Sequence, residues 1–289
     1  MILVVGATGS LGGRIARGLL EQGKEVRVVV RPRSDGKALI DRGAEPIAAD
    51  LKDRPSLDAA VHGVNTVITT ANSARRSAPD TVEAVDDHGN RNLIDAAAAA
   101  GVGQFIFVSG LGANPSSPVP FIAAKGKAEE HLRSSRLRHT ILQPNAYMDV
   151  WLGMLFGMPL AEGRPIVLVG EGRRKHSMIA EDDVRAFAQA AVDNPAAINR
   201  ILVLGGPEPI SFLDAVAVYE RALGRQLDAR HVAPGSPLTG VPDPVAALLA
   251  GMDSYDSPIQ MDEMARTFDV KLTSLVQFVQ QSLRVSVRI

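Results

Sequence analysis

Short apolar runs alternate with amphipathic stretches through the first half of the chain. Ile2 to Val5 is continuously apolar, as a buried parallel strand is. Leu11, Ile15 and Leu19 then recur at helical spacing, so a helix is predicted from about Leu11. The same alternation continues to Gln143 and predicts strands at 26–30, 46–49, 64–70, 105–108 and 139–143, and helices at 54–61, 82–100 and 121–135.

Strands that alternate with helices pair in parallel through right-handed crossovers. The sequence therefore predicts an α/β fold with a doubly wound parallel sheet. After Pro144 the pattern changes to a stretch rich in Met, Leu and aromatic residues, followed by Pro- and Gly-rich segments. There we expect strands at 166–169 and 201–204, helices at 181–194, 211–223 and 273–283, and irregular structure at 233–258.

A glycine-rich turn separates the first strand from the first helix, with the spacing Gly6-x-x-Gly9-x-x-Gly12. Glycines let the backbone turn sharply and let a pyrophosphate approach, and the helix N-terminus directs N–H groups and partial positive charge at it. The spacing differs from the standard G-x-G-x-x-G, but its place between strand and helix favours a dinucleotide site over an empty turn. The expected contacts are Gly6, Thr8, Gly9, Ser10, Leu11 and Gly12.

The second predicted strand ends in Arg31-Pro32-Arg33-Ser34, and no Asp or Glu occurs from Val26 to Ser34. An acidic residue at this position would bind the 2′-hydroxyl of NAD, whereas Arg accommodates a 2′-phosphate. The sequence therefore favours an NADP(H)-binding site at Arg31, Arg33 and Ser34 over the alternative, a basic loop that contacts only solvent. Because ligands bind outside the carboxyl ends of parallel strands, further contacts are expected from Asp50, Leu51, Thr70, Ala71, Asn72, Ser109, Pro144, Asn145 and Ala146.

Composition narrows the class of protein. With a formal net charge of −1 over 289 residues, the protein has no overall positive potential that would attract nucleic acid or a membrane surface. The absence of Cys excludes disulfides and a thiolate nucleophile, and no apolar run reaches the ~20 residues of a membrane span. No signal peptide is apparent, so a cytoplasmic location is expected. The six scattered His predict no metal site, and Asp86-Asp87 is interpreted as a helix-terminal or surface pair.

Several motifs together resemble those of the extended and atypical short-chain dehydrogenase/reductases, most closely the NmrA-like group, over nearly the whole length. The resemblance implies a Rossmann-type NADP-binding domain at 1–147, rejoined by about 178–205, and a smaller substrate region at 148–289. Its carriers are Gly6-Ala7-Thr8-Gly9-Ser10-Leu11-Gly12, Ala49-Asp50-Leu51-Lys52-Asp53, Asn92-Leu93-Ile94-Asp95-Ala96-Ala97, Phe107-Val108-Ser109, Lys125-Gly126-Lys127-Ala128-Glu129-Glu130-His131-Leu132, Thr140-Ile141-Leu142-Gln143-Pro144 and Gly205-Gly206-Pro207-Glu208.

The family's usual catalytic set is a Ser after the fifth strand and a Tyr-x-x-x-Lys on the next helix. Ser109 and Lys125 match, but Phe121 stands at the Tyr position and cannot exchange a proton. In the similar isoflavone and phenylcoumaran reductases the Lys performs the proton transfer, which implies the same role for Lys125. Alternatively, Lys125 binds the nicotinamide ribose, and the acceptor needs little help with its proton, as a quinone does.

These features predict an NADPH-dependent reductase of a small apolar carbonyl, enone or quinone, with Ser109 and Lys125 as catalytic residues. Phe121, Tyr147 and Trp151 are expected to contact a flat apolar substrate. A different class stays open: a non-catalytic NADP(H)-sensing regulator that binds a protein partner, which the missing Tyr supports. A homodimer stays open as well, whereas direct nucleic-acid binding and membrane association are not expected.

Overall fold

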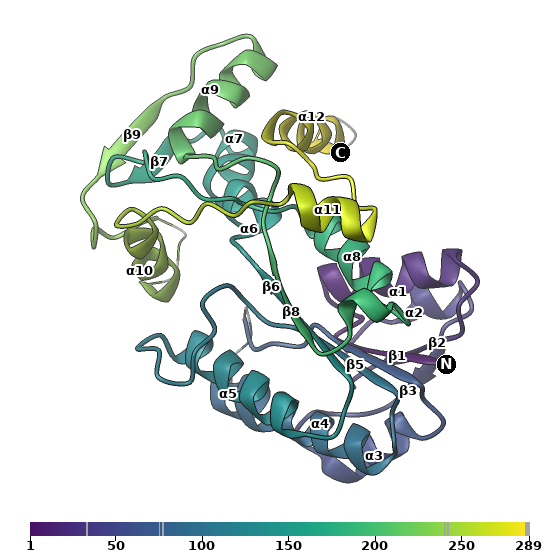
Figure 1. Ribbon diagram of the computed structural model, residues 1–289. Coiled ribbons are helices and arrows are strands. Elements are labelled where there is room, and N and C mark those ends of the chain that lie inside the picture. Colours follow the sequence, from purple (N-terminus) through teal and green to yellow (C-terminus); the bar gives the residue numbers. More distant parts are fainter. Residues whose placement is uncertain (33, 75, 77, 240, 242, 287–289) are drawn as a thin grey trace. The chain divides into compact units, whose positions relative to one another are not determined.

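The computed structural model describes residues 1–289 except 33, 75, 77, 240, 242 and 287–289 (Figure 1). The described chain forms two compact units. The first unit comprises Met1–Pro144, Val184–Val203 and Thr267–Val270, and the second comprises Asn145–Asp183, Leu204–Arg266 and Lys271–Ile289. Neither unit is one continuous segment. That these units act as the cofactor and substrate domains expected at 1–147 and 148–289 stays a prediction.

A seven-stranded sheet with the order β3-β2-β1-β4-β5-β6-β8 confirms the predicted doubly wound architecture. All five pairings from β3 to β6 are parallel. All seven strands predicted for this sheet are confirmed to within two residues at either end. The bounds are β1 Ile2–Val5, β2 Val26–Val29, β3 Glu45–Ile47, β4 Thr66–Thr69, β5 Gln104–Val108, β6 His139–Pro144 and β8 Arg200–Leu204.

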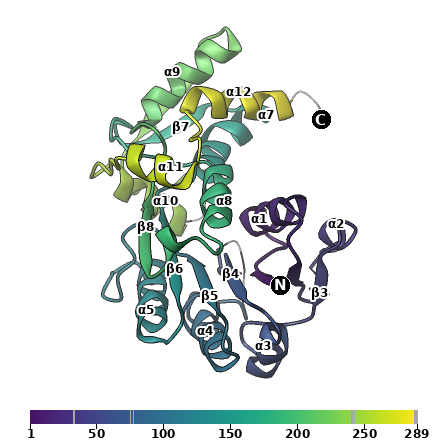
Figure 2. The same ribbon diagram turned by 45° about the vertical axis from the view of Figure 1, so that its right-hand side comes forward.

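Helices cover both faces of this sheet (Figures 1 and 2). On one face α3 (Arg54–Val61), α4 (Asn90–Ala99) and α5 (Pro120–Ser134) bury Leu57, Leu93 and Leu132 in one apolar cluster with the strands. On the other face lies α1 (Ser10–Glu21), which buries Ile15 and Leu19. The Gln189 side chain donates a hydrogen bond to the Ile15 carbonyl at 3.2 Å. This unit also contains α2 (Lys37–Ile40), η3 (Pro195–Ala197) and most of α8 (Glu181–Ala190).

The helix predicted at 82–100 consists of two segments, because its first eight residues, η1 (Val82–Gly89), form a wider π-helix. The amide of Asn90 explains how this wider turn is held. Its Nδ2 donates to the carbonyls of Val85 at 3.1 Å and Asp86 at 3.3 Å. Thr81 caps the start by accepting a hydrogen bond from the Ala84 N–H. Such π-turns occur frequently at functional sites, and this one positions two aspartates.

The second unit has its own apolar core, in which the rings of Phe156 and Tyr219 stack with centroids 4.9 Å apart. A two-stranded parallel sheet pairs β7 with β9. Ser211 caps α9 as predicted, in a reciprocal hydrogen-bonded box with Asp214. The elements are α6 Met148–Leu152, η2 Gly153–Gly157, α7 Met158–Ala161, β7 Ile166–Val169, α9 Phe212–Leu223, β9 Ala229–Val232, α10 Asp243–Met252, α11 Asp262–Phe268, the last two residues of which belong to the first unit, and α12 Leu275–Ser286.

Two predictions in this half are wrong. Irregular structure was expected at 233–258, but α10 occupies residues 243–252. A proline is tolerated in the first turn of a helix, and a continuous Val-Ala-Ala-Leu-Leu-Ala run follows it. The helix predicted at 181–194 ends at Ala190, because Asp193 adopts a positive φ of 54° that an α-helix cannot contain. No helix in the described ranges is long and apolar enough to cross a membrane.

Candidate functional site

The glycine turn after β1 has the close packing that its sequence requires. Gly6 has a φ of 88°, and a Cβ placed there would lie 2.6 Å from Thr70 Oγ1. A Cβ on Gly12 would lie 2.3 Å from the Gly6 carbonyl oxygen. Both approaches are too short for any side chain, so the two glycines bring α1 directly against the turn and the end of β4. The turn thereby places the first residues of α1 at the carboxyl edge of the sheet.

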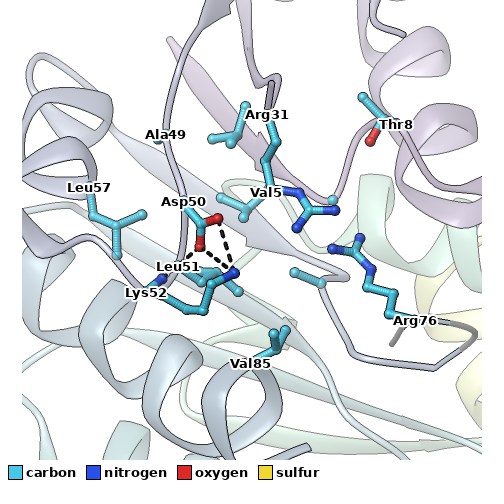
Figure 3. Close-up of a pocket in the computed structure, with 13 residues that line it drawn as sticks. Val5, Thr8, Arg31, Ala49, Asp50, Leu51, Lys52, Leu57, Arg76 and Val85 are labelled. Atoms are coloured by element: carbon cyan, nitrogen blue, oxygen red, sulfur yellow. Dashed lines mark hydrogen bonds and ion pairs between the residues drawn. The ribbon is translucent and has the colours of Figure 1, made fainter. Parts of the chain in front are cut away.

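A pocket opens at this edge (Figure 3). Six of the predicted cofactor contacts line it, and they come from the glycine turn after β1 and from the segments that follow β2, β3 and β4. Apolar walls come from Val5, Val29, Leu57 and Val85. The predicted contacts that line the pocket are Gly6, Thr8, Arg31, Asp50, Leu51 and Ala71.

The other predicted cofactor contacts of the first unit surround this pocket or follow other strands. Gly9 is the N-cap of α1, and Ser10, Leu11 and Gly12 form its first turn. The Thr70 N–H donates to the Val5 carbonyl, and the Asn72 amide donates to the Thr70 carbonyl. Ser34 closes a turn by donating its N–H to the Arg31 carbonyl. Arg33 lies outside the described residues.

Three cations meet one carboxylate at the mouth of this pocket. Asp80 accepts from Arg31 Nη1 at 2.6 Å and from Arg76 Nη1 at 3.2 Å, and it also pairs with Lys52 Nζ. Lys52 Nζ lies 3.0 Å from Asp50 Oδ1 as well. These hydrogen bonds from Lys52, Arg31 and Arg76 hold the pKa of Asp80 well below its usual range. We call Arg31, Lys52, Arg76 and Asp80 the Asp80 cluster.

Sequence reasoning identified only Arg31 of this cluster. Lys52 stands in a family motif, and neither Arg76 nor Asp80 was expected in the site. Because the Ala71–Asp80 loop follows β4, which pairs with β1, its end is brought near the end of β2. Neighbouring strand ends were therefore the signal that could have identified Lys52, Arg76 and Asp80.

Lys125 is buried at the other end of the same carboxyl edge, with 2% of its surface exposed. It lies in the second turn of α5, where its ammonium donates to the Val108 carbonyl at 3.3 Å. The ammonium lies 3.6 Å from Asp86 Oδ1. The ring centroids of Phe107 and Phe121 are 4.9 and 5.5 Å from Nζ. Phe121 therefore contributes a ring face to the lysine, which favours the cationic form.

Asp86 is fully buried, so its interpretation as a helix-terminal or surface charge is wrong. The π-helical η1 buries Asp86 and Asp87 with Val85. The N–H and hydroxyl of Ser73 donate to Asp86 Oδ2 at 2.9 and 2.5 Å. Asp86 Oδ1 then has only the ion pair with Lys125 among the described residues. Asp86 is therefore oriented by Ser73 toward the lysine.

Burial lowers the pKa of Lys125, because a desolvated ammonium is less stable than a desolvated amine. The charges of Asp86 and Glu129 oppose this shift. A lysine in this balance holds a proton at Nζ and releases it more readily than an exposed lysine does. Proton transfer to a bound acceptor is therefore within its chemical reach.

Ser109 and Glu129 complete the surroundings of Lys125. Ser109 follows β5 directly and is 7% exposed, and its hydroxyl has no hydrogen-bond partner among the described residues. Glu129 lies one turn after Lys125 and binds Gln143 Nε2 with both oxygens at 2.9 Å. Burial raises the pKa of Glu129, and the hydrogen bonds that it accepts from Gln143 oppose that rise. Glu129 was missed from the sequence, although its i+4 spacing from Lys125 places both on one helix face.

The last five predicted site residues lie around the end of β6 and just beyond it. Pro144 ends β6 in the first unit, and its carbonyl accepts from the Leu111 N–H. Asn145 belongs to the second unit, where its amide donates to Ser257. Ala146 and Tyr147 pair with the backbone of Ile179, and Trp151 packs on the core of the second unit. Burial raises the pKa of Tyr147.

Among the described residues there is no group of three His, Cys, Asp or Glu side chains that could hold a metal ion. The cations and carboxylates of the site instead form two clusters. One is the Asp80 cluster, and the other comprises Lys125, Asp86, Ser73, Ser109 and Glu129. We call the latter the Lys125 cluster.

The family model of the NmrA-like family matches residues 1–282. The chain belongs to the NmrA-like family. It is 32% identical to the NAD(P)H azoreductase of Xenophilus azovorans over 234 residues, which are 81% of this chain and 77% of that protein. It is 31% identical to the photosystem II assembly factor Ycf39 of Guillardia theta over 231 residues, 80% of this chain and 73% of that protein.

Solved structures share the fold. An NADPH-dependent quinone oxidoreductase from Escherichia coli, complexed with NADPH, has a TM-score of 0.83 and 22% identity, covering 98% of this chain and 100% of that one. The triphenylmethane reductase of Citrobacter sp., complexed with NADP(H), has a TM-score of 0.80 and 22% identity, with the same coverage. At this identity the likeness establishes the Rossmann-type fold.

Proposed function

We propose that this protein is an NADPH-dependent reductase that transfers a hydride to a small apolar carbonyl, enone or quinone. The single observation that carries the proposal is the buried Lys125 cluster at the carboxyl edge of a doubly wound sheet. Ligands of such sheets bind at that edge. A buried lysine beside a serine hydroxyl without a partner is the arrangement expected where a reacting group is to be bound.

The pocket beside the glycine turn fits the adenosine end of a dinucleotide. Its walls are apolar, the glycine turn lies at one end, and three cations lie at its mouth. We propose that the backbone from Gly6 to Gly12 binds the pyrophosphate, that Asp50 and Leu51 lie beside adenine, and that Arg31 binds the 2′-phosphate. Ser34, Thr70, Ala71 and Asn72 would border the cofactor. When bound, the reduced nicotinamide supplies the hydride.

The Lys125 cluster then supplies the proton. Nζ holds a proton between the Val108 carbonyl and Asp86. We propose that Ser109 donates a hydrogen bond to the acceptor oxygen, which gains negative charge as its carbon takes the hydride. The Nζ–H bond breaks as the new O–H bond forms, and solvent returns a proton to the neutral amine. Phe121, Tyr147 and Trp151 are proposed to contact the substrate, and Pro144, Asn145 and Ala146 to border the nicotinamide.

The relatives support this proposal and set the choice of substrates. An azoreductase is among the relatives, and a quinone oxidoreductase and a dye reductase share the fold. The test is consumption of NADPH by the purified protein against quinones, enones, aldehydes, azo dyes and triphenylmethane dyes. Turnover of one class that Lys125→Ala abolishes supports the proposal. If saturating NADPH is consumed with none of these acceptors, the reductase proposal fails.

A second candidate function is an NADP(H)-binding regulator that acts on a protein partner. Phe121 at the usual Tyr position and the similarity to photosystem II assembly factors favour it. Such a protein would bind NADPH without turnover and would bind its partner differently with oxidised and reduced cofactor. Affinity for the two cofactor forms, measured beside the turnover panel, distinguishes the two functions.

A further inference from the structure

We propose that Asp80 is an internal substitute for the 2′-phosphate of NADP(H), and that the cofactor must displace this carboxylate from Arg31, Lys52 and Arg76. Asp80 thereby lowers the preference of the site for NADPH over NADH. The inference rests on the proposed function, because it concerns the adenosine end of the same site. It assigns a specificity role to a residue outside the glycine turn and outside the usual position after β2.

The first observation is that the side chain predicted to bind the phosphate is already paired. Arg31 Nη1 lies 2.6 Å from Asp80 Oδ2, with 29% of the arginine side chain and 13% of the aspartate side chain exposed. Arg76 lies 3.2 Å from the same oxygen, and Lys52 pairs with the other. One carboxylate therefore occupies three donors that a phosphate would use. Charge-assisted contacts of this kind are the strong ones.

The second observation is the charge of the group. Three cations pair with Asp80, and one of them, Lys52, also pairs with Asp50, so the cluster and Asp50 together carry one net positive charge. A phosphate monoester brings about −1.5 to −2 charges. If Asp80 stayed in place, the occupied site would be net negative, and two anions would lie within a few ångströms of each other. If Asp80 leaves, the remaining charges nearly cancel, so displacement is the favoured arrangement.

The third observation is the position of Asp80 in the chain. It is the last residue of the Ala71–Asp80 loop, immediately before Thr81, the N-cap of η1. Ala71 and Arg76 of the same loop line the pocket. The carboxylate thus comes from the loop that borders the pocket, outside the described strands and helices, and rotation of its side chain would free the cations. An adenosine with a free 2′-hydroxyl needs no such displacement.

The test compares Asp80→Asn with the wild-type full-length protein in binding of NADPH and NADH. We expect Asp80→Asn to tighten NADPH about tenfold, which corresponds to 1.4 kcal/mol, and to leave NADH within about twofold. Asp80→Glu keeps the charge and should bind both cofactors as the wild type does. Asp41→Asn is the matched control, because Asp41 makes an exposed i,i+4 pair with Lys37 away from the pocket.

The same measurement with adenosine 2′,5′-bisphosphate and with inorganic phosphate separates the sources of the anion. Tighter bisphosphate binding by Asp80→Asn, with no measurable binding of inorganic phosphate, supports the proposal. Equal gains for both anions would show a general anion site and overturn it. An unchanged or weakened NADPH affinity in Asp80→Asn would overturn it as well, because Asp80 would then be neutral or would organise the cations.

Three further outcomes are distinguishable. If Asp80→Asn does not fold, Lys52→Met provides the second variant: removing one cation should weaken NADPH about tenfold and spare NADH, and equal loss of both overturns the inference. If the wild type binds neither NADPH nor NADH, the proposed function fails and the inference fails with it. If both bind but Asp80→Asn leaves their ratio unchanged, only the inference fails.

Discussion

At the residue scale, the 2′-phosphate and the reacting oxygen each have a proposed cationic partner, and the two can be tested separately. Arg31 is paired with Asp80 at the pocket mouth. Losing a charge-assisted contact costs on the order of 1.5–3 kcal/mol. Arg31→Ala should therefore weaken NADPH by about ten- to a hundredfold and spare NADH. Titration of both cofactors checks this, and an equal loss for both would remove Arg31 from the role.

Lys125 is the second partner. General acid–base help is worth roughly 10²–10⁴ in rate, so Lys125→Ala should lose about that much turnover while NADPH still binds. Because burial lowers the pKa of Lys125 below the ordinary 10.5, turnover in the wild type should fall as pH rises through a midpoint below that value. The variant should lack this alkaline fall. A variant that loses mainly NADPH affinity would identify Lys125 as a ribose anchor instead.

The pair of Lys125 and Asp86 also predicts a stability effect. Removing one partner of a buried ion pair leaves an uncompensated charge and costs about 3–5 kcal/mol, whereas replacing both costs much less. Lys125→Met should therefore lower the free energy of unfolding more than Lys125→Met combined with Asp86→Asn. Asn keeps an acceptor for Ser73, which donates to Asp86 twice. Urea denaturation measures this, and a double variant as unstable as the sum of the single variants would show that the pair is not coupled.

At the element scale, the glycine turn depends on close backbone contact between β1 and α1. A Cβ on Gly12 would lie 2.3 Å from the Gly6 carbonyl oxygen, and backbone atoms cannot rotate away as a side chain can. Gly12→Ala should therefore destabilise the protein by about 1–3 kcal/mol and weaken NADPH and NADH alike. Gly153→Ala is the matched control, since a Cβ there meets nothing within 4 Å. Thermal unfolding and cofactor titration check both variants, and an unaffected Gly12→Ala would contradict the argument.

The elements that periodicity defines could be predicted, and those that depend on local exceptions could not. The strands of the first half and α3 follow from apolar runs and helical spacing, so sequence alone located their ends within a few residues. The π-helical form of η1 depends on the Asn90 side chain, which binds two carbonyls of the preceding turn. The site could likewise be predicted only in part. A sequence motif identifies Lys125, but its partner Asp86 lies in the π-helical η1, whose geometry helical spacing rules do not describe. Asp86 is oriented by Ser73, thirteen positions earlier in the chain.

At the scale of the whole molecule, the Asp80 cluster should stabilise the folded protein at neutral pH, and this contribution should be lost in acid. Hydrogen bonds from three cations hold the pKa of Asp80 below its ordinary 3.8. A depressed carboxylate pKa contributes stability that is present above the unfolded pKa and lost as pH falls through the folded pKa. The wild type should therefore unfold at a higher temperature than Asp80→Asn at pH 7, and the difference should shrink as the pH falls below about 4. A difference that stays constant across this range would show that the pairing contributes nothing.

The order of the strands in the sheet has a consequence for synthesis on the ribosome. The strand beside β6 is β8, and it begins at Arg200, whereas β6 ends at Pro144. At roughly 5–20 residues per second, several seconds pass between emergence of the two strands. During that interval β6 has an open edge, and open edges recruit other strands. A nascent chain stalled near residue 170 should therefore aggregate or recruit chaperones, and one stalled beyond residue 240 should not.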